Sequence, residues 1–214
     1  MRRCSLILLG TMLLLAGPDS FAQEVLDRIV ARIENDVILL SDMRELSHYQ
    51  MFVDGKSESD DKLLDRLIDQ WIVRNEATVS RIAQPSDEDV NRSLARLKRS
   101  FSSQEEFEER RKQSGLSEED LRRLTKSQLY LSNYLDTRFR PVIQIDDKEI
   151  ENFYQTRVIP RAQSRGQSPP TLEAARDFIQ EALVQRAINE QADKWLKESR
   201  TRVRVENLLQ EGQK

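Results

Sequence analysis

The residue types that support covalent or metal chemistry are scarce in this chain. His48 is the only histidine and Cys4 the only cysteine among 214 residues. Catalytic triads pair a histidine with a serine or cysteine nucleophile, and zinc sites usually combine several histidine or cysteine ligands. His48 has no second ligand type near it, so an ordinary place on a helix is favoured over a ligand role. We therefore expect no catalytic residues, no metal and no cofactor.

Charged side chains make up 33% of the residues, and the net charge of −3 is mildly acidic. Basic clusters recur along the chain, at Arg92, Arg96 and Arg99, at 110–112 and at 122–123. Each is interleaved with acidic residues and none lies among stacking aromatics, which favours solvated helix faces over a nucleic-acid surface. The many carboxylates are interpreted in the same way, as solvated faces rather than acid/base pairs.

Flexible and aromatic side chains gather in one segment and indicate a surface for other chains. Met43 and Met51 lie close to Tyr49 and Phe52. Thioethers and aromatics suit a surface that accepts varied apolar partners. The alternative is that these side chains fill the core, as apolar helix stripes usually do. The predicted peptide-binding residues, with two weaker candidates from a later helix at the end, are Met43, Tyr49, Met51, Phe52, Tyr130 and Tyr134.

Residues 1–22 have the features of a secretory signal peptide. Arg2 and Arg3 precede an apolar run from Leu6 to Ala16, and a small-x-small cleavage site ends at Ala22. A transmembrane anchor is the alternative, but the run is shorter than the roughly 20 residues that cross a bilayer. We therefore expect export, a mature chain that begins at Gln23 without cysteine, and no stable membrane insertion after cleavage.

The remaining chain predicts helices framed by short strands. Apolar residues alternate at 29–33, Asn35-Asp36 can form a tight turn, and 37–40 returns as a second strand. Alternation reappears only at 200–205. Because a two-stranded hairpin alone is marginal, we expect the closing strand to pair beside residues 28–33. The fold class is therefore mainly α, with a small antiparallel sheet made by the N-terminal hairpin and the C-terminal strand.

Helix boundaries follow from capping signals. We expect Ser41 or Asp42 to cap a first helix, and a second helix over about 60–82. Three S/T-x-x-acid patterns predict later helix starts, at Ser86, Ser103 and Ser117, and Gly115 suits a helix end. A long helix then runs to Pro141, and a short extended piece precedes a helix cap at Asp146 or Asp147. Residues 158–171 are predicted to be a linker, and Thr171 caps the last helix.

In this order the segments resemble SurA-type periplasmic chaperones. The similar stretches are VLDRIVARIENDVILLSDMRE, LIDQWIVRNEA, SDEDVNRSLARLKRSF, SQEEFEERRKQSGLSEEDLRRLTKSQLYLS and ADKWLKESRTRVRVENL. The resemblance implies a helical chaperone core, with 23–157 as its N-terminal region and 172–214 completing the same domain. It also implies ATP-independent holding of unfolded outer-membrane proteins, or other exported polypeptides, in the periplasm.

One departure from the family pattern limits what the resemblance implies. SurA-like proteins commonly carry parvulin-type prolyl isomerase domains where this chain has only residues 158–171, far short of the roughly 50 residues of a small domain. We therefore do not expect isomerase activity. Two alternatives stay open: an isomerase-related protein with unusual or no activity, and a periplasmic adaptor or assembly subunit that binds one folded partner.

Overall fold

The computed structural model describes residues 27–210 and is mainly helical, with one three-stranded sheet. The predicted signal peptide lies outside the described residues. The strands are β1 (Ile29–Ile33), β2 (Asp36–Leu39) and β3 (Val205–Asn207). The helical elements are α1 (Leu40–Asp54), α2 (Asp60–Val79), α3 (Asp87–Arg99), α4 (Gln104–Gln113), α5 (Glu118–Phe139), η1 (Arg140–Val142), α6 (Asp147–Phe153), η2 (Tyr154–Val158), α7 (Ile159–Ser164) and α8 (Leu172–Arg200).

The sheet joins the two ends of the described chain. Its strand order is β2-β1-β3 and both pairings are antiparallel, with Ala31 opposite Asn207 and Ile33 opposite Val205. The predicted pairing of the closing strand with the hairpin is therefore confirmed. Leu209, which follows β3, is only 6% exposed and belongs to the core formed with β1, α1 and α2.

Details of the strands differ from the sequence prediction. Ile33 pairs with Asp36, so the turn is Glu34-Asn35, with Glu34 at φ 51°, instead of Asn35-Asp36. The Glu34 side chain accepts a hydrogen bond from the backbone N–H of Arg204 at 2.7 Å, which connects the turn to the closing segment. The closing strand begins at Val205, later than expected, because residues 201–203 first form turns on the end of α8.

Most helix starts are confirmed at the predicted residues. Ser86 with Asp89 and Ser117 with Asp120 form reciprocal capping boxes, and Gly115 has φ 74°. Ser103 caps the N–H of Glu106, but the Glu106 carboxylate reaches back to the N–H of Ser102 instead of Ser103.

Three local predictions are wrong. The first helix begins at Leu40, and the Asp42 carboxylate accepts a hydrogen bond from the N–H of Leu39 at 2.8 Å, so neither Ser41 nor Asp42 is the cap residue. The expected extended piece after Pro141 is wrong only at its start, which forms the 3-10 turn η1; Ile143 is extended, and Asp146 caps α6 as predicted. Within the predicted linker, residues 159–164 are helical. Pro160 does not prevent this, because it lies in the first turn of α7, where proline is compatible with a helix.

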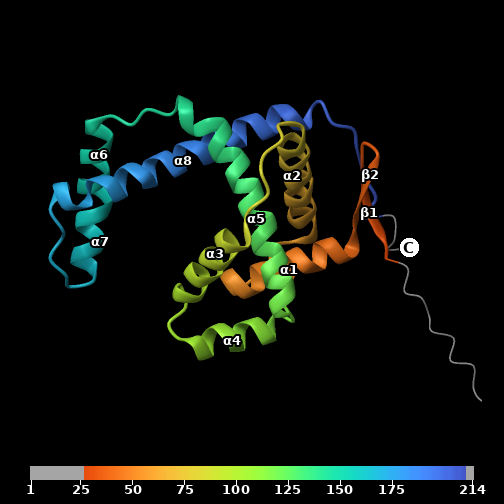
Figure 1. The fold of residues 1–214 in the computed structure, drawn as a ribbon, viewed down its shortest axis with the longest axis horizontal. Coiled ribbons are helices and arrows are strands. Elements are labelled where there is room, and N and C mark those ends of the chain that lie inside the picture. Colours follow the sequence, from red (N-terminus) through yellow and green to blue (C-terminus); the bar gives the residue numbers. More distant parts are fainter. Residues whose placement is uncertain (1–26, 211–214) are drawn as a thin grey trace, which may run out of the picture.

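Helix α8 connects two parts of the molecule (Figure 1). One part, here called the lobe, contains α6, η2, α7 and the N-terminal half of α8, with Ile150, Ala175 and Ile179 buried between them. The other, the body, contains the sheet and α1–α5, and Trp195 and Leu196 of α8 pack against two of its apolar clusters. Within residues 27–210, no helix has the length and apolar character needed to cross a bilayer.

Candidate polypeptide-binding groove

Four of the six residues predicted to bind peptides lie in the packed core. The exposed fractions are 2% for Met43, 0% for Phe52, 7% for Tyr130 and 2% for Tyr134. Phe52 makes an aromatic cluster with Phe101 and Phe107, with ring centroids 5.2 and 5.3 Å away. These placements correspond to the core alternative, and their role in binding stays a prediction.

Tyr130 and Tyr134 pack where α5 meets α2 and α8. Both belong to an apolar cluster with Val73 and Leu131, against which Trp195 packs. The Tyr134 hydroxyl accepts a hydrogen bond from Arg138 at 2.9 Å, and the Tyr134 ring lies 5.9 Å from that of Trp195. In this conformation the two tyrosines hold α5 against the neighbouring helices.

Tyr49 and Met51 are the two accessible members of the predicted set. Met51 is 42% exposed, and Tyr49 is partly buried. The Tyr49 side chain lines two separate hollows, one between α1, α2 and α5 and one between α3 and α5. Burial, followed by the negative charge of Asp54, raises the pKa of the Tyr49 phenol above its ordinary value. The phenol therefore stays neutral near pH 7 and can donate a hydrogen bond.

Three hollows meet around one residue of α5, Gln128. Their volumes are about 150 Å³ between α1, α2 and α5, about 280 Å³ between α2, α5 and α8, and about 440 Å³ between α3 and α5. Gln128 lines all three, Gln70 lines the first two, and Ser132 lines the second and third. We call the surface formed by these three adjoining hollows the Gln128 groove.

The Gln128 groove is lined by apolar, neutral polar and charged side chains. The charged ones are Asp42, Glu45, Asp69, Arg74, Arg96, Arg123 and Asp136. Leucine and aromatic side chains come from α1, α2, α3 and α5, at Tyr49, Leu67, Trp71, Leu97, Leu124, Leu129 and Leu135. Amide and hydroxyl side chains alternate with them, at Gln70, Ser93, Ser100, Ser127, Gln128, Ser132, Gln185 and Asn189. Amides and hydroxyls both donate and accept hydrogen bonds, so they match the N–H and C=O groups of any polypeptide backbone. Apolar side chains next to such groups suit an extended, sequence-varied chain.

A buried hydroxyl lies beside the largest of the three hollows. Thr125 lines that hollow and is 5% exposed. Its Oγ1 has no hydrogen-bond partner among the residues that the structure describes. A buried hydroxyl without a partner costs free energy, so a bound chain that reached Thr125 would be stabilised by the new hydrogen bond.

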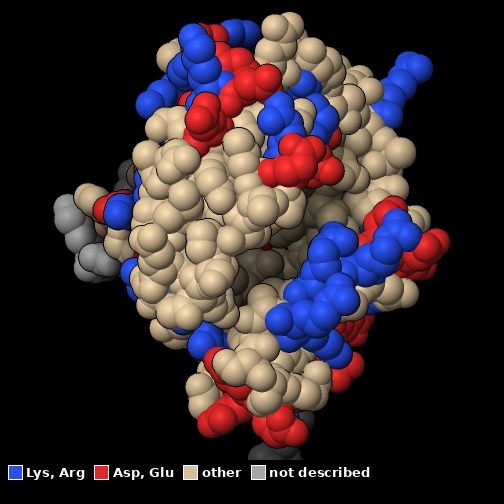
Figure 2. Space-filling view, turned by 90° about the vertical axis from the view of Figure 1, so that its left-hand side faces the viewer, with Lys and Arg blue, Asp and Glu red and all other residues tan. Residues whose placement is uncertain are grey.

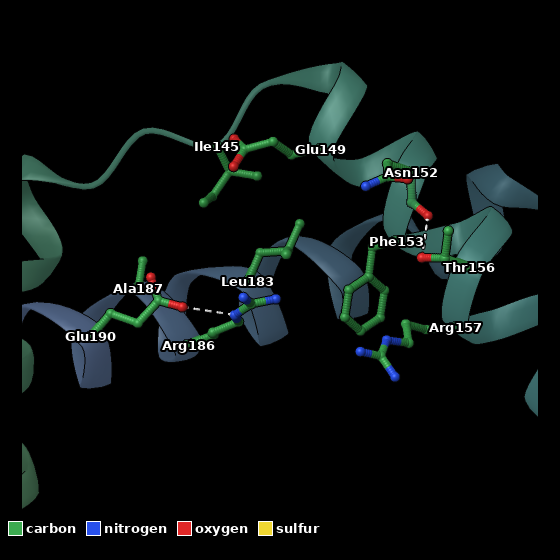
Figure 3. Close-up of a pocket in the computed structure, with 10 residues that line it drawn as sticks. All are labelled: Ile145, Glu149, Asn152, Phe153, Thr156, Arg157, Leu183, Arg186, Ala187 and Glu190. Carbon is green, nitrogen blue, oxygen red and sulfur yellow. Dashed lines mark hydrogen bonds and ion pairs between the residues drawn. The ribbon is translucent and has the colours of Figure 1, made fainter.

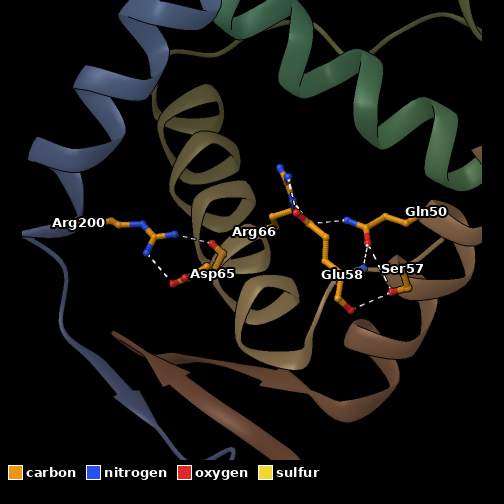
Figure 4. A network of polar contacts seen from close by, with 6 residues as sticks. All are labelled: Gln50, Ser57, Glu58, Asp65, Arg66 and Arg200. Carbon is orange, nitrogen blue, oxygen red and sulfur yellow. Dashed lines mark hydrogen bonds and ion pairs between the residues drawn. The ribbon is translucent and has the colours of Figure 1, made fainter. Parts of the chain in front are cut away.

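Ion pairs hold the helices around the Gln128 groove. Arg123 of α5 pairs with Glu45 of α1, and Arg122 of α5 bonds Asp87 and Asn91 of α3 at 3.0 and 2.6 Å. Elsewhere in the body, Arg200 of α8 pairs with Asp65 of α2 at 2.8 Å (Figure 4). Arg200 also pairs with Asp69 of the same helix at 2.7 Å. These contacts link helices distant in sequence, so they set the width of the hollows between them.

The loop between α1 and α2 is tied down by a compact polar network (Figure 4). The Gln50 amide donates to Glu58 at 2.8 Å and accepts from the Glu58 backbone N–H at 2.9 Å, and Arg66 pairs with the same carboxylate. Arg66, then Gln50, lowers the pKa of Glu58 to about 2. The network therefore fixes the angle between α1 and α2, the helices that carry Tyr49 and Trp71.

A further hollow, of about 320 Å³, lies in the lobe between α6, η2 and α8 (Figure 3). Two of its polar side chains are bound to nearby residues. Arg186 pairs with Glu190 at 2.9 Å, and Thr156 donates to the carbonyl of Asn152 at 2.7 Å. In the range 27–210 there is no cluster of three or more potential metal ligands.

Comparison with known proteins places this chain near one class of protein, chaperones. The curated relatives in question are each named chaperone SurA. That of Pseudomonas syringae pv. tomato is 29% identical over 150 residues, that of Pseudomonas putida 28% over 149, and that of Pseudomonas aeruginosa 30% over 138. The aligned parts cover 66%, 65% and 60% of this chain, and 35%, 35% and 33% of the respective relatives. No family model matches the chain.

The chain is thus a distant homologue of chaperone SurA, and it spans about a third of the length of these relatives. This confirms the resemblance found in the sequence and is consistent with a SurA-like chaperone module. Sequence reasoning did not find the Gln128 groove. Its polar residues lie on faces of helices that are far apart in sequence, and only the packing of α5 against α2, α3 and α8 brings those faces together.

Proposed function

We propose that this protein is an ATP-independent chaperone of the periplasm that binds unfolded, apolar and aromatic segments of outer-membrane proteins and prevents their aggregation. The observation that carries the proposal is the Gln128 groove, where apolar side chains lie together with amide, hydroxyl and charged side chains. Homology to chaperone SurA supports it.

The physical basis is burial without a strong sequence requirement. Each apolar side chain that leaves water gains roughly 25 cal/mol per Å² of buried area. The amide and hydroxyl side chains of the groove can hydrogen-bond the backbone of an unfolded chain whatever its sequence. Because ordering a flexible segment costs free energy, the net affinity for the unfolded chain stays modest. The folding of that chain away from the groove is then sufficient to release it. No nucleotide is required in this scheme.

We infer that Tyr49 and Met51 contact the bound chain directly. Tyr49 lies between two of the hollows and presents a neutral phenol, and Met51 offers a flexible, half-exposed thioether on the same helix. A bound aromatic side chain would pack against Tyr49 in an offset or edge-to-face arrangement.

The test is whether the chain from Gln23 onward keeps an outer-membrane protein soluble when that protein is diluted from urea without ATP. Light scattering should fall as chaperone is added and should reach a minimum near a fixed ratio of the two proteins. Scattering that is unchanged at a large excess of chaperone would refute the proposal. Recovery of a single folded partner from periplasm, with no unfolded β-rich chains, would instead favour the adaptor role.

We also infer that the chain acts by binding alone, without prolyl isomerase activity. The homology covers about a third of SurA, and α7 with its flanking loop stands where the resemblance would allow an isomerase domain. In a proline-peptide turnover assay we expect the background rate, and a rate that rises in proportion to the concentration of the chain would contradict this inference.

A further inference from the structure

The lobe contains a hollow that the Gln128 groove does not include. It lies between η2 and α7 on one side and α8 on the other, with a volume of about 700 Å³. This volume is within the range of ligand-binding sites, about 300 to 1,000 Å³. Figure 2 shows the end of the molecule that carries the lobe, with a hollow bordered by basic side chains.

The two walls of this lobe hollow differ in chemistry. One wall carries Arg157, Arg161 and Arg165, spaced four residues apart. The facing wall, on α8, contributes only apolar side chains, and its members Ala174, Phe178 and Ala182 are also spaced four residues apart. Each wall therefore presents a row of like side chains, one basic and one apolar.

The basic wall has unused charge. Within residues 27–210, Arg157, Arg161 and Arg165 form no ion pair, and no acidic side chain of that range lines the hollow. Other arginines of the lobe are paired, for example Arg176 with Asp147 and Arg186 with Glu190. The basic wall is therefore complementary to an anionic ligand.

The apolar wall is exposed and rigidly supported. Phe178 is 72% exposed, an unusual position for a large aromatic side chain, while Ala175 and Ile179 beside it are buried in the lobe core. The hydroxyl of Tyr154 donates to the carbonyl of Pro170 at 2.6 Å, which ties η2 to the segment that leads into α8. The two walls are thus held at a set separation.

We propose that the lobe hollow binds an extended polypeptide segment in which acidic and apolar residues alternate. Side chains four apart on a helix are about 6 Å apart along its axis. Successive side chains of an extended chain point to opposite sides, and neighbouring side chains on one side are about 6.6 Å apart. A strand lying in the hollow therefore sets its acidic side chains against the arginine row and its apolar side chains against Ala174, Phe178 and Ala182.

The repeated spacing favours a polypeptide over an anionic lipid. A lipid places one charged headgroup at the end of its apolar tails, and so does not match three arginines that face several apolar side chains. The inference rests on the proposed function, because it assigns to the same chaperone a second surface for unfolded chains and gives that surface a sequence preference.

The test is fluorescence anisotropy of labelled peptides with the chain from Gln23 onward. Three peptides of equal length alternate glutamate with leucine, lysine with leucine, and glutamate with serine. We expect binding of the glutamate–leucine peptide at least tenfold tighter than of the other two, and weaker binding as salt is raised. Equal affinity for all three peptides would overturn the proposal.

Two charge-reversal variants locate the site. R161E/R165E should weaken binding of the glutamate–leucine peptide at least tenfold, and Phe178→Ser should weaken it severalfold. R81E/R99E changes the net charge equally at exposed positions outside the hollow and should leave binding unchanged. Equal effects of the two double variants would overturn the site, as would competition by anionic vesicles that abolishes peptide binding in the wild-type chain.

The outcome is separable from that of the proposed function. An uncharged, aromatic-rich client should be protected from aggregation as well by R161E/R165E as by the wild-type chain, because it binds in the Gln128 groove. Full protection of that client together with unchanged binding of the glutamate–leucine peptide by R161E/R165E would overturn the lobe site alone. Loss of all protection in the wild-type chain would instead refute the chaperone function.

Discussion

At the scale of single residues, the sequence predicts which side chains are suited to bind apolar partners, but not which of them are exposed to solvent. Met43 and Met51 are alike in sequence context, yet Met43 is 2% exposed and Met51 42% exposed. The difference arises because Met43 faces the sheet and α2, whereas Met51 lies on the outer side of α1. Helical periodicity shows which residues share one face of a helix, but it does not show which neighbouring element covers that face.

Replacing each methionine with glutamate should separate the two roles. Met43→Glu places an unpaired charge in the core and should lower the free energy of unfolding by roughly 3 to 5 kcal/mol. Met51→Glu should change it by no more than about 0.5 kcal/mol and should weaken client protection. Urea denaturation followed by circular dichroism measures the first effect and light scattering the second. A stable, fully protective Met51→Glu variant would contradict a contact role for Met51.

Filling the Gln128 groove should abolish protection without unfolding the chain. Gln128→Trp places a bulky ring where the three hollows meet, whereas Asn133→Trp puts the same ring at an exposed position of α5 that lines none of them. We expect at least a severalfold loss of protection for Gln128→Trp and none for Asn133→Trp at equal helicity. Loss in both variants, or in neither, would argue against the groove.

The pKa of Glu58 predicts how stability depends on pH. Because the fold stabilises the carboxylate, this contribution is complete above the ordinary pKa of 4.5 and is lost as pH falls from 4.5 towards about 2. The wild-type chain should therefore lose more stability over that window than Glu58→Gln does. Thermal unfolding at several pH values measures the difference, with Glu173→Gln as a surface control. Parallel pH profiles for wild type and Glu58→Gln would contradict the assignment.

At the scale of elements, local chemistry predicted most of the helices and strands. Serine caps at 86, 103 and 117 act within three residues, and the alternation at 29–33 identified β1, although a bulge there also buries Val30. The closing strand was placed a few residues early, since Val203 belongs to a turn that still packs on the core. α7 was missed because a short helix beside proline and glycine has no apolar period.

The closing segment should contribute stability mainly through one side chain. Leu209 is 6% exposed in the core beneath β1, whereas its neighbour Leu208 is partly exposed. Leu209→Ala should lower the free energy of unfolding by about 2 to 4 kcal/mol, and Leu208→Ala by clearly less. Chemical denaturation of the two variants compares them. An equal cost would mean that β3 and its extension are not anchored by Leu209.

At the scale of the whole molecule, α8 joins two surfaces with different preferences. Its C-terminal half completes the body that carries the Gln128 groove, and its N-terminal half forms the apolar wall of the lobe hollow. An unfolded chain long enough to span both would be held at two places, which raises its effective affinity without new contacts at either. The sequence predicted that residues 172–214 complete one domain with 23–157, but the separate lobe becomes visible only in the packing of α6 and α7.

The most direct test of the groove is photo-crosslinking to an unfolded outer-membrane protein without ATP. A photoreactive residue is placed singly at positions 49, 128 and 133. We predict strong crosslinks from positions 49 and 128, lost once the client has folded, and only background from position 133. Crosslinking that is equal at all three positions, or absent from 49 and 128, would contradict the account.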